Sequence, residues 1–246
     1  MKNTNKRRFG VLEVIYICTT LLLVGGLIAA LASLNIKNEQ KQSQDYFKEY
    51  YDKKVAAFAA ENANYAKGQN VFIGDSITDL YHLDEYYSDL DKATYNRGIG
   101  GDTTIGVLNR LDVSLYQIVP SNIVLMIGIN DINSGYLEDD IIARYTSILD
   151  NIKSNLPSSK LFVMSILPMH DAMQGYIDLN KNTEIIISIN SKIRLLAEER
   201  SYQYMDLFSL VKDEDNHLIK AYSDDGIHLN DAGFRVWTDL VKPVLI

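Results

Sequence analysis

The 246-residue chain is 47% hydrophobic and 23% charged, which is ordinary for a globular protein, excludes intrinsic disorder and allows one α/β domain with a sizeable core. The first 33 residues hold four of the 24 basic residues and one of the 32 acids, so the remainder carries a net charge of −11. This charge repels polyanions and excludes nucleic acid and anionic lipid surfaces as tight partners.

The first predicted element is a transmembrane signal-anchor at residues 11–36. Residues 14–34 are uncharged, and as a helix they would be about 31 Å long, which matches the hydrocarbon thickness of a bilayer. A basic tail, residues 1–10, precedes the anchor, so the positive-inside rule places the N-terminus in the cytoplasm and residues 37–246 outside. Two alternatives stay open: a signal peptide cleaved after Ala30-Leu31-Ala32, which resembles a small-x-small cleavage site, and a helix buried in the core.

Residues 37–67 are predicted to form a juxtamembrane helix or stalk. Apolar side chains recur at helical spacing at Phe47, Tyr51, Val55 and Phe58, with charged residues around them. This stripe indicates a helix that docks on the domain that follows. A solvated coiled coil is the alternative, but the segment has too few heptads to favour it.

Short apolar runs alternate with helical patterns between residues 68 and 246, which predicts a single α/β domain. Five runs are predicted as strands, at 71–73, 93–96, 123–127, 161–166 and 202–207. Helices are predicted from apolar residues three or four positions apart, at Ile141, Tyr145, Ile148 and Ile152, at Ile185, Ile189, Ile193 and Leu196, and at Trp237, Leu240, Val241 and Val244. Right-handed crossovers then give a parallel sheet with helices on both faces, and a ligand site at the carboxyl ends of the strands.

The first strand ends in Gly74-Asp75-Ser76, at the edge of the sheet where a ligand site is expected. Ser76 follows the strand and precedes a helical segment, a position that suits a nucleophile because helix N-terminal amides point outward there. Taken alone, the motif also fits a loop serine or a helix N-cap. Its meaning therefore depends on what else lies at this edge.

Two further stretches fall at the same edge. The second strand runs into residues 95–103, a glycine-rich turn that opens a helix. A phosphate cradle is disfavoured there because the turn lacks the Gly-Lys-Ser/Thr ending, which leaves a simple tight turn as the alternative. The third strand ends in Gly128-Ile129-Asn130-Asp131, which brings the side-chain amide of Asn130 to the expected ligand site. The alternative is that Asn130 serves only an Asx-turn or a helix cap.

Near the C-terminus, Asp225 and His228 are three residues apart, so in a turn or a helix start both side chains lie on one side. Together with the other stretches they supply the parts of an acyl-transfer site. Ser76 would attack, His228 would take its proton, and Asp225 would orient the imidazole. N–H donors of Ser76, Gly101 and Asn130 would form the oxyanion hole.

These stretches resemble the SGNH (GDSL-type) hydrolases, a family of esterases and lipases, over about residues 68–246. Four blocks occur in the family's order, at residues 72–76, 96–103, 128–131 and 225–228. The resemblance implies a flavodoxin-like three-layer αβα sandwich around a five-stranded parallel sheet, preceded here by the transmembrane helix. It also implies the same site: Ser76 as nucleophile, Gly101 and Asn130 as oxyanion donors, and Asp225 with His228 completing the triad.

Residues 74–79 and 83–86 are also similar to the branch of platelet-activating-factor acetylhydrolases, which cleave short acyl groups. The resemblance implies a serine esterase that removes acetyl or other short acyl groups from a glycan or a small lipid and needs no metal ion or organic cofactor, and the predicted anchor places it on the outer side of a membrane. Three alternatives remain: an O-acyltransferase with the same triad, a lysophospholipase-like lipid esterase, and a non-catalytic glycan-binding domain.

The other histidines, His82, His170 and His217, are predicted to lie at the surface or in loops. None has a His-x-x-x-His partner, which disfavours a zinc site.

Overall fold

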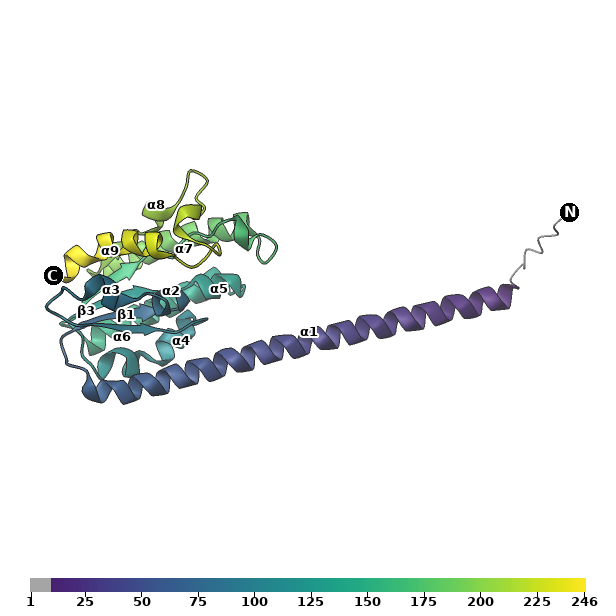
Figure 1. The fold of residues 1–246 in the computed structure, drawn as a ribbon, viewed down its shortest axis with the longest axis horizontal. Coiled ribbons are helices and arrows are strands. Elements are labelled where there is room, and N and C mark those ends of the chain that lie inside the picture. Colours follow the sequence, from purple (N-terminus) through teal and green to yellow (C-terminus); the bar gives the residue numbers. More distant parts are fainter. Residues whose placement is uncertain (1–9) are drawn as a thin grey trace. The chain divides into compact units, whose positions relative to one another are not determined.

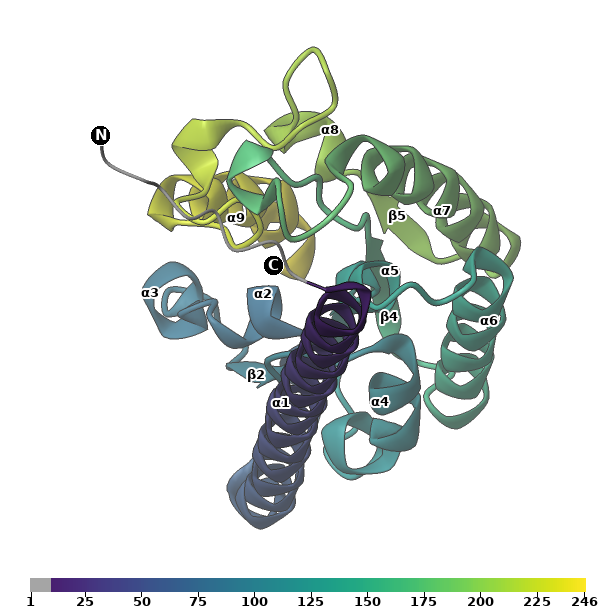
Figure 2. The same ribbon diagram turned by 90° about the vertical axis from the view of Figure 1, so that its right-hand side faces the viewer.

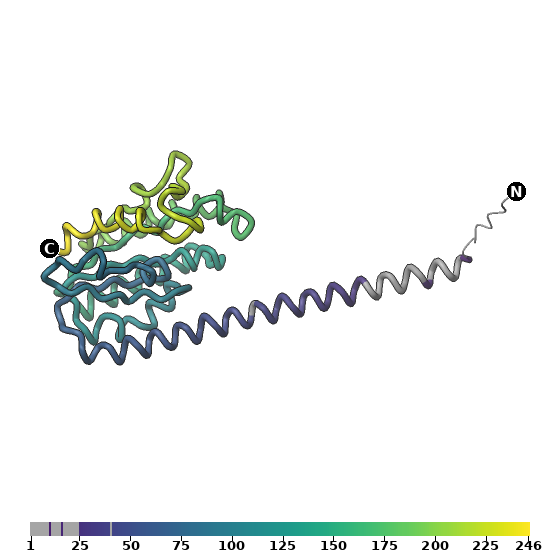
Figure 3. Tube along the Cα trace, in the orientation of Figure 1, coloured from purple at the N-terminus to yellow at the C-terminus, as the bar shows by residue number. Residues whose placement is uncertain are grey.

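The computed structural model describes the backbone of residues 10–246 and the side chains of residues 10, 16, 25–39 and 41–246 (Figure 3). Half of the predicted anchor, residues 11–15 and 17–24, lies outside the described side chains. Within the part of the chain that is described, we find no helix with the length and apolar character of a membrane span. The described chain divides into two compact units, and the second begins at Tyr50.

Helix α1 (Val11–Glu61) is continuous across residue 36, where the predicted anchor ends, and stops before residue 67, where the predicted stalk ends. From Tyr50 onward the helix belongs to the second unit. Phe58 is buried there against Ile99, with Tyr51 and Val55 packed beside it. The last turns of α1 are therefore part of the globular domain, which differs from the predicted boundary between residues 67 and 68.

The domain is built on one sheet of five parallel strands in the order β2-β1-β3-β4-β5. Strands β1 and β3 of this sheet are labelled in Figure 1. The strands are β1 (Asn70–Gly74), β2 (Thr94–Gly98), β3 (Asn122–Met126), β4 (Lys160–Met164) and β5 (Gln203–Met205). Each of the five predicted strands is confirmed, with ends that differ by a few residues. The order, in which the second strand lies outside the first, is that of a flavodoxin-like sheet, as predicted.

Helices cover both faces of the sheet (Figure 2). One face carries α2 (Ser76–Asp79), α3 (Leu83–Tyr87) and α9 (Asp231–Leu245), and the other carries α4 (Thr104–Asn109), α6 (Glu138–Asn155) and α7 (Leu179–Glu199). Shorter elements complete the described chain: α5 (Ile129–Asn133), α8 (Phe208–Val211), a π-helical turn (Asp112–Tyr116) and 3₁₀ turns (Asn62–Asn64, Asp171–Met173 and Lys220–Tyr222). The three-layer sandwich is confirmed.

The core lies on both sides of the central strands. All residues of β1 and β3 are buried, as expected for parallel strands that are covered on both faces. The apolar stripes predicted for three helices face this core, with Tyr145 of α6, Ile193 of α7 and Trp237 of α9 all fully buried. The carboxyl ends of β1, β2 and β3 meet at one edge, where the helix-forming segments begin.

Candidate active site

The sharp turn after β1 presents Ser76 at the edge of the sheet. Asp75 caps helix α2, because its Oδ1 accepts a hydrogen bond of 3.0 Å from the backbone N–H of Ile77. A Cβ atom at Gly74 would collide with the backbone carbonyl of Met126 on the neighbouring strand, so only glycine fits there. This close approach explains why the strand ends in Gly-Asp-Ser: the glycine allows the turn, and the aspartate starts the helix on which Ser76 lies.

Ser76, His228 and Asp225 form a continuous chain of hydrogen bonds. The Oγ of Ser76 lies 2.8 Å from Nε2 of His228, and Nδ1 of the same ring lies 2.6 Å from Oδ2 of Asp225. Ser76 and His228 are 152 residues apart in the chain and are brought together where the segment before α9 reaches the carboxyl end of β1. The structure therefore joins the three residues that the sequence predicted separately.

The Asp225 carboxylate is held in place by the backbone around it. Its Oδ1 accepts from the N–H of Ile227 at 3.0 Å and from the N–H of His228 at 2.8 Å. Partial burial acts to raise the pKa of Asp225, but the hydrogen bonds from the His228 ring and from these backbone groups outweigh it and lower the pKa to about 2. The adjacent Asp224 accepts instead from Asn230, at 3.3 Å.

The two predicted oxyanion donors lie on neighbouring loops. Gly101 follows β2 and has a φ of +77°, a conformation that favours glycine. Asn130 is in the first turn of α5, just after β3, and its Nδ2 donates a 2.9 Å hydrogen bond to the carbonyl of Asp102, the residue next to Gly101. An amide NH₂ group has two hydrogens, so the second remains for another acceptor.

Arg110 is a buried cation that the sequence reasoning missed. Its Nε donates to Asp102 at 2.8 Å, its Nη1 to the carbonyl of Arg97 at 2.8 Å, and its Nη2 to the carbonyl of Gly74 at 2.9 Å. Burial raises the pKa of Asp102, and the Arg110 charge opposes that rise. One guanidinium thus ties the ends of β1 and β2 together beneath the site. The sequence signal was a single basic residue between the apolar residues Leu108 and Leu111.

His170 lies in the loop after β4, in agreement with its predicted surface or loop role, but it is buried, with 6% of its surface exposed. Its Nδ1 accepts from the N–H of Ala172 at 3.1 Å, so Nε2 carries the proton and donates to the carbonyl of Ser223 at 3.2 Å. Its backbone N–H donates to the carbonyl of Gly226 at 3.0 Å. His170 therefore fastens the loop that carries Asp225, whereas His82 is exposed as predicted.

Among the described residues, no group of three or more His, Cys, Asp or Glu side chains is arranged to hold a metal ion.

Asp75 is fully buried next to Ser76. Its Oδ2 has no hydrogen-bond partner among the described residues. Burial raises the pKa of Asp75 to about 7, and the nearby charges of Asp102 and Asp131 add to the rise, whereas the hydrogen bond from Ile77 opposes it. This carboxyl group therefore keeps its proton to a much higher pH than an exposed aspartate does.

Replacement of Asp75 by asparagine is expected to stabilise the domain more at pH 8 than at pH 4. The carboxyl group of an unfolded aspartate loses its proton near pH 3.8, whereas Asp75 in the fold keeps it to about pH 7, so the wild type loses stability as the pH rises between these values. The difference in the free energy of unfolding would reach about 4 kcal/mol at most. An asparagine oxygen can still accept from Ile77.

Chemical denaturation of the purified protein at the two pH values measures this difference. The matched control is Asp91→Asn, which removes the charge of an exposed aspartate. A change in the free energy of unfolding that is the same at pH 4 and pH 8 for Asp75→Asn would contradict the assignment of a raised pKa.

Comparison with known proteins agrees with this geometry. Residues 72–236 match the GDSL-like lipase/acylhydrolase family. Among solved structures, a protein from Streptococcus pneumonia described as a candidate platelet activating factor is similar with a TM-score of 0.77 and 27% identity, over 84% of this chain and 97% of that one. The likeness to an acetyl-xylooligosaccharide esterase from Geobacillus Stearmophilus, with a TM-score of 0.59 and 19% identity over 74% and 95% of the chains, shows the fold alone.

A curated relative matches a smaller part of the chain. The N-acylneuraminate cytidylyltransferase of Escherichia coli O18:K1:H7 is 26% identical over 124 residues, which is 50% of this chain and 28% of that protein. The chain thus matches little more than a quarter of the length of that relative. The family match covers more than half of the chain and includes the blocks at residues 72–76 and 225–228, so the predicted resemblance is confirmed. The chain belongs to the GDSL-like lipase/acylhydrolase family and is a serine hydrolase that acts on ester bonds.

Proposed function

We propose that the domain cleaves esters through an acyl-enzyme formed on Ser76. The observation that carries this proposal is the unbroken hydrogen-bond chain from the Ser76 hydroxyl through the His228 ring to the Asp225 carboxylate. Asp225 holds a proton on Nδ1 of His228, so Nε2 is free to accept the proton of the serine hydroxyl. This arrangement turns a weak nucleophile into one that can attack a carbonyl carbon.

In the first half-reaction, the Ser76 Oγ bonds to the ester carbonyl carbon while His228 takes the hydroxyl proton. The carbonyl oxygen becomes an oxyanion, which the N–H groups of Ser76 and Gly101 and the Nδ2 of Asn130 stabilise. The C–O bond to the alcohol then breaks, and His228 gives its proton to the departing oxygen. In the second half-reaction, water attacks the acyl-enzyme with His228 again as the base, which releases the carboxylic acid and restores Ser76.

We propose acetyl and other short acyl groups, carried by a glycan or a small lipid, as the substrates. The loops at the carboxyl ends of three strands are short, with one residue between β1 and α2, five between β2 and α4, and two between β3 and α5. These three loops provide little chain that could cover a long acyl group, which leaves the segment between β4 and α7, residues 165–178, as the longer one at this edge. The descriptions of two similar proteins, a platelet activating factor and an acetyl-xylooligosaccharide esterase that shares the fold alone, are in line with these classes.

A panel of aryl esters tests this proposal on the full chain in detergent, with Ser76→Ala as the blank. We expect kcat/KM to be highest for the acetyl or butyryl ester and at least about tenfold lower for the octanoyl ester, because methylenes that do not fit a short acyl pocket displace the carbonyl group from its reactive position. Equal or faster turnover of the octanoyl ester would favour a lysophospholipase-like lipid esterase. Product formation that requires an added sugar hydroxyl would favour an O-acyltransferase.

We also propose that residues 14–34 anchor the protein in a membrane, with the catalytic domain on the outer side. The uncharged run and the basic residues before it support this topology. The full chain should then stay with the membrane fraction after a high-salt wash, and external protease should reach the domain. Recovery of a soluble form that begins near Ser33 would instead indicate a cleaved signal peptide.

A further inference from the structure

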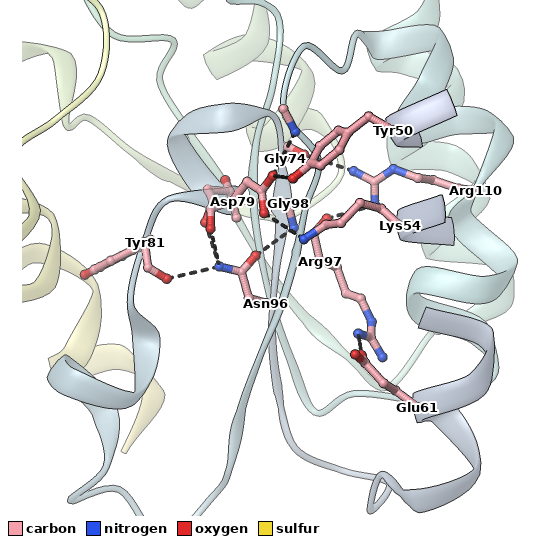
Figure 4. Close-up of polar contacts among 12 residues, drawn as sticks. Tyr50, Lys54, Glu61, Gly74, Asp79, Tyr81, Asn96, Arg97, Gly98 and Arg110 are labelled. Atoms are coloured by element: carbon pink, nitrogen blue, oxygen red, sulfur yellow. Dashed lines mark hydrogen bonds and ion pairs between the residues drawn. The ribbon is translucent and has the colours of Figure 1, made fainter. Parts of the chain in front are cut away.

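One carboxylate connects helix α1, the nucleophile helix and the loop after β2, as Figure 4 shows. Asp79 is the last residue of α2, the helix that begins with Ser76. Its Oδ2 accepts from the Tyr50 hydroxyl at 2.6 Å and from the backbone N–H of Gly100 at 3.0 Å, and its Oδ1 accepts from the Lys54 ammonium at 2.7 Å. The Asp79 side chain is only 14% exposed, so these charge-assisted bonds are partly shielded from water.

Residues 98–103 are called the oxyanion loop from here on. Asn96, which precedes the loop, fastens its start to the nucleophile helix. The Nδ2 of Asn96 donates to the carbonyls of Thr78 at 2.7 Å and Tyr81 at 3.0 Å, and its Oδ1 accepts from the N–H of Gly98 at 2.7 Å (Figure 4). The loop is therefore held at Gly98 by Asn96 and at Gly100 by Asp79, one residue before Gly101.

The end of α1 holds the strand that leads into the oxyanion loop. Arg97 of β2 is fully buried and donates to Glu61 at 2.7 Å and to Asn62 at 2.7 Å. Its guanidinium also lies over the rings of Phe58, at 4.4 Å, and Tyr65, at 4.7 Å. Cation–π contacts of a desolvated guanidinium are among the stronger ones, so this end of β2 has little freedom to move away from α1.

We infer that helix α1 positions the oxyanion loop through Tyr50, Lys54 and Glu61, with Tyr50 and Lys54 as positioning residues that act through Asp79. This inference rests on the proposed function of Gly101 as an oxyanion donor. The N–H of Gly101 must lie at hydrogen-bond distance from an oxygen that becomes charged only in the transition state. The bond from Gly100 to Asp79 restricts the peptide next to Gly101, and Tyr50 and Lys54 restrict Asp79.

Lys54 has a second, electrostatic role in the inference. The Asp79 carboxylate accepts a hydrogen bond from the backbone N–H of Gly100, the residue next to Gly101. The negative charge of Asp79 therefore lies beside the loop that binds the negatively charged oxyanion. Like charges raise the energy of that transition state, more so where the site is shielded from water. The Lys54 ammonium, at 2.7 Å from Asp79, neutralises the carboxylate and removes this cost.

The first test measures steady-state kinetics of the full chain carrying Tyr50→Phe, Lys54→Met or both. We expect the double variant to lose about 10- to 100-fold in kcat, because a catalytic group displaced by about 1 Å can cost 10²-fold. KM should change by less than about twofold, since the oxyanion contact is made only in the transition state. The pH profile should keep its shape because the triad is untouched, and Lys54→Arg should restore most of the activity.

Tyr51→Phe is the matched control. It removes a hydroxyl from the next residue of the same helix, and that hydroxyl donates to the carbonyl of Gly106 at 2.9 Å rather than to Asp79. We expect kcat of this variant to stay within about twofold of the wild type, with a melting temperature similar to that of Tyr50→Phe. Equal losses of kcat in Tyr50→Phe and Tyr51→Phe would show that α1 only supports the fold.

Hydrogen–deuterium exchange gives a readout that does not depend on turnover. Backbone amides of residues 98–101 should exchange about tenfold faster in the Tyr50→Phe/Lys54→Met variant than in the wild type, because their local opening becomes easier. They should be unchanged in Tyr51→Phe. Unchanged exchange in the double variant would overturn the inference, whether or not the wild type cleaves esters. If exchange becomes faster in the double variant but the wild type cleaves none of the panel esters, the result counts only against the proposed function.

Discussion

Replacement of Ser76 by alanine is expected to abolish both ester hydrolysis and covalent labelling by a fluorophosphonate. The Ser76 Oγ is the atom that hydrogen-bonds to Nε2 of His228, at 2.8 Å, and alanine leaves that ring without a group to deprotonate. Loss of a triad nucleophile removes the covalent pathway, so kcat should fall by about 10⁴-fold or more. The backbone N–H groups and the Asp75 cap of α2 stay in place, so the variant should fold like the wild type.

Circular dichroism and the melting temperature show whether the variant is folded, and a fluorescent fluorophosphonate on a gel shows the labelling. Ser147→Ala is the matched control, because Ser147 lies half-buried on α6 and its hydroxyl bonds only to the carbonyl of Ala143 among the hydrogen bonds described for it. Wild-type labelling is expected in the control. If labelling persisted in a folded Ser76→Ala protein, another residue would be the nucleophile.

Replacement of Asp225 by asparagine is expected to lower kcat by about 10²- to 10⁴-fold, in line with the loss of a triad carboxylate. The carboxylate accepts from Nδ1 of His228 at 2.6 Å and so keeps the ring proton on that nitrogen. An asparagine amide can turn an N–H toward Nδ1 of His228, and the ring then carries its proton on Nε2. A protonated Nε2 cannot accept the proton of the Ser76 hydroxyl. The negative charge that stabilises the imidazolium is lost as well.

Asp224→Asn is the control for this prediction, because the two acids are neighbours and the change is the same. Asp224 accepts from Asn230 at 3.3 Å, so we expect kcat within about twofold of the wild type. Kinetics of the two purified variants, both checked for folding, decide the assignment. A greater loss in Asp224→Asn than in Asp225→Asn would show that the wrong acid has been assigned.

Most of the fold could be predicted from the chain alone, because a parallel sheet covered on both faces needs strands that are apolar throughout. Strands β1 and β3 are such runs, and they stand out against the helical spacing of residues such as Ile141 and Tyr145. The location of the candidate site could also be predicted from the sequence. Carboxyl ends of parallel strands meet at one edge, so short motifs after separate strands could be placed together before their contacts were known.

The residues that support the site from beneath and from the side, Arg110 and His170, could not be predicted from sequence patterns. Arg110 joins the ends of two strands through backbone carbonyls, and His170 fastens the Asp225 loop through two others. A carbonyl is present at every residue, so no pattern of side chains in the sequence indicates which carbonyl a buried donor will meet. The burial of His170 likewise follows from packing of distant segments and not from its neighbours in the chain.

The sequence by itself determined the order of strands and helices along the chain and the edge at which the candidate site lies, and it predicted the residues of the triad, because apolar periodicity and motif spacing are local properties. Only the tertiary structure decided where the domain begins. The predicted boundary between residues 67 and 68 placed all of helix α1 outside the domain, whereas the last turns of the helix, up to Glu61, pack on it and Glu61 accepts from Arg97 of β2. Tyr50 and Lys54 reach Asp79 from 29 and 25 residues away. Such pairings depend on how α1 packs on β2, and packing between distant segments is decided by the fold as a whole.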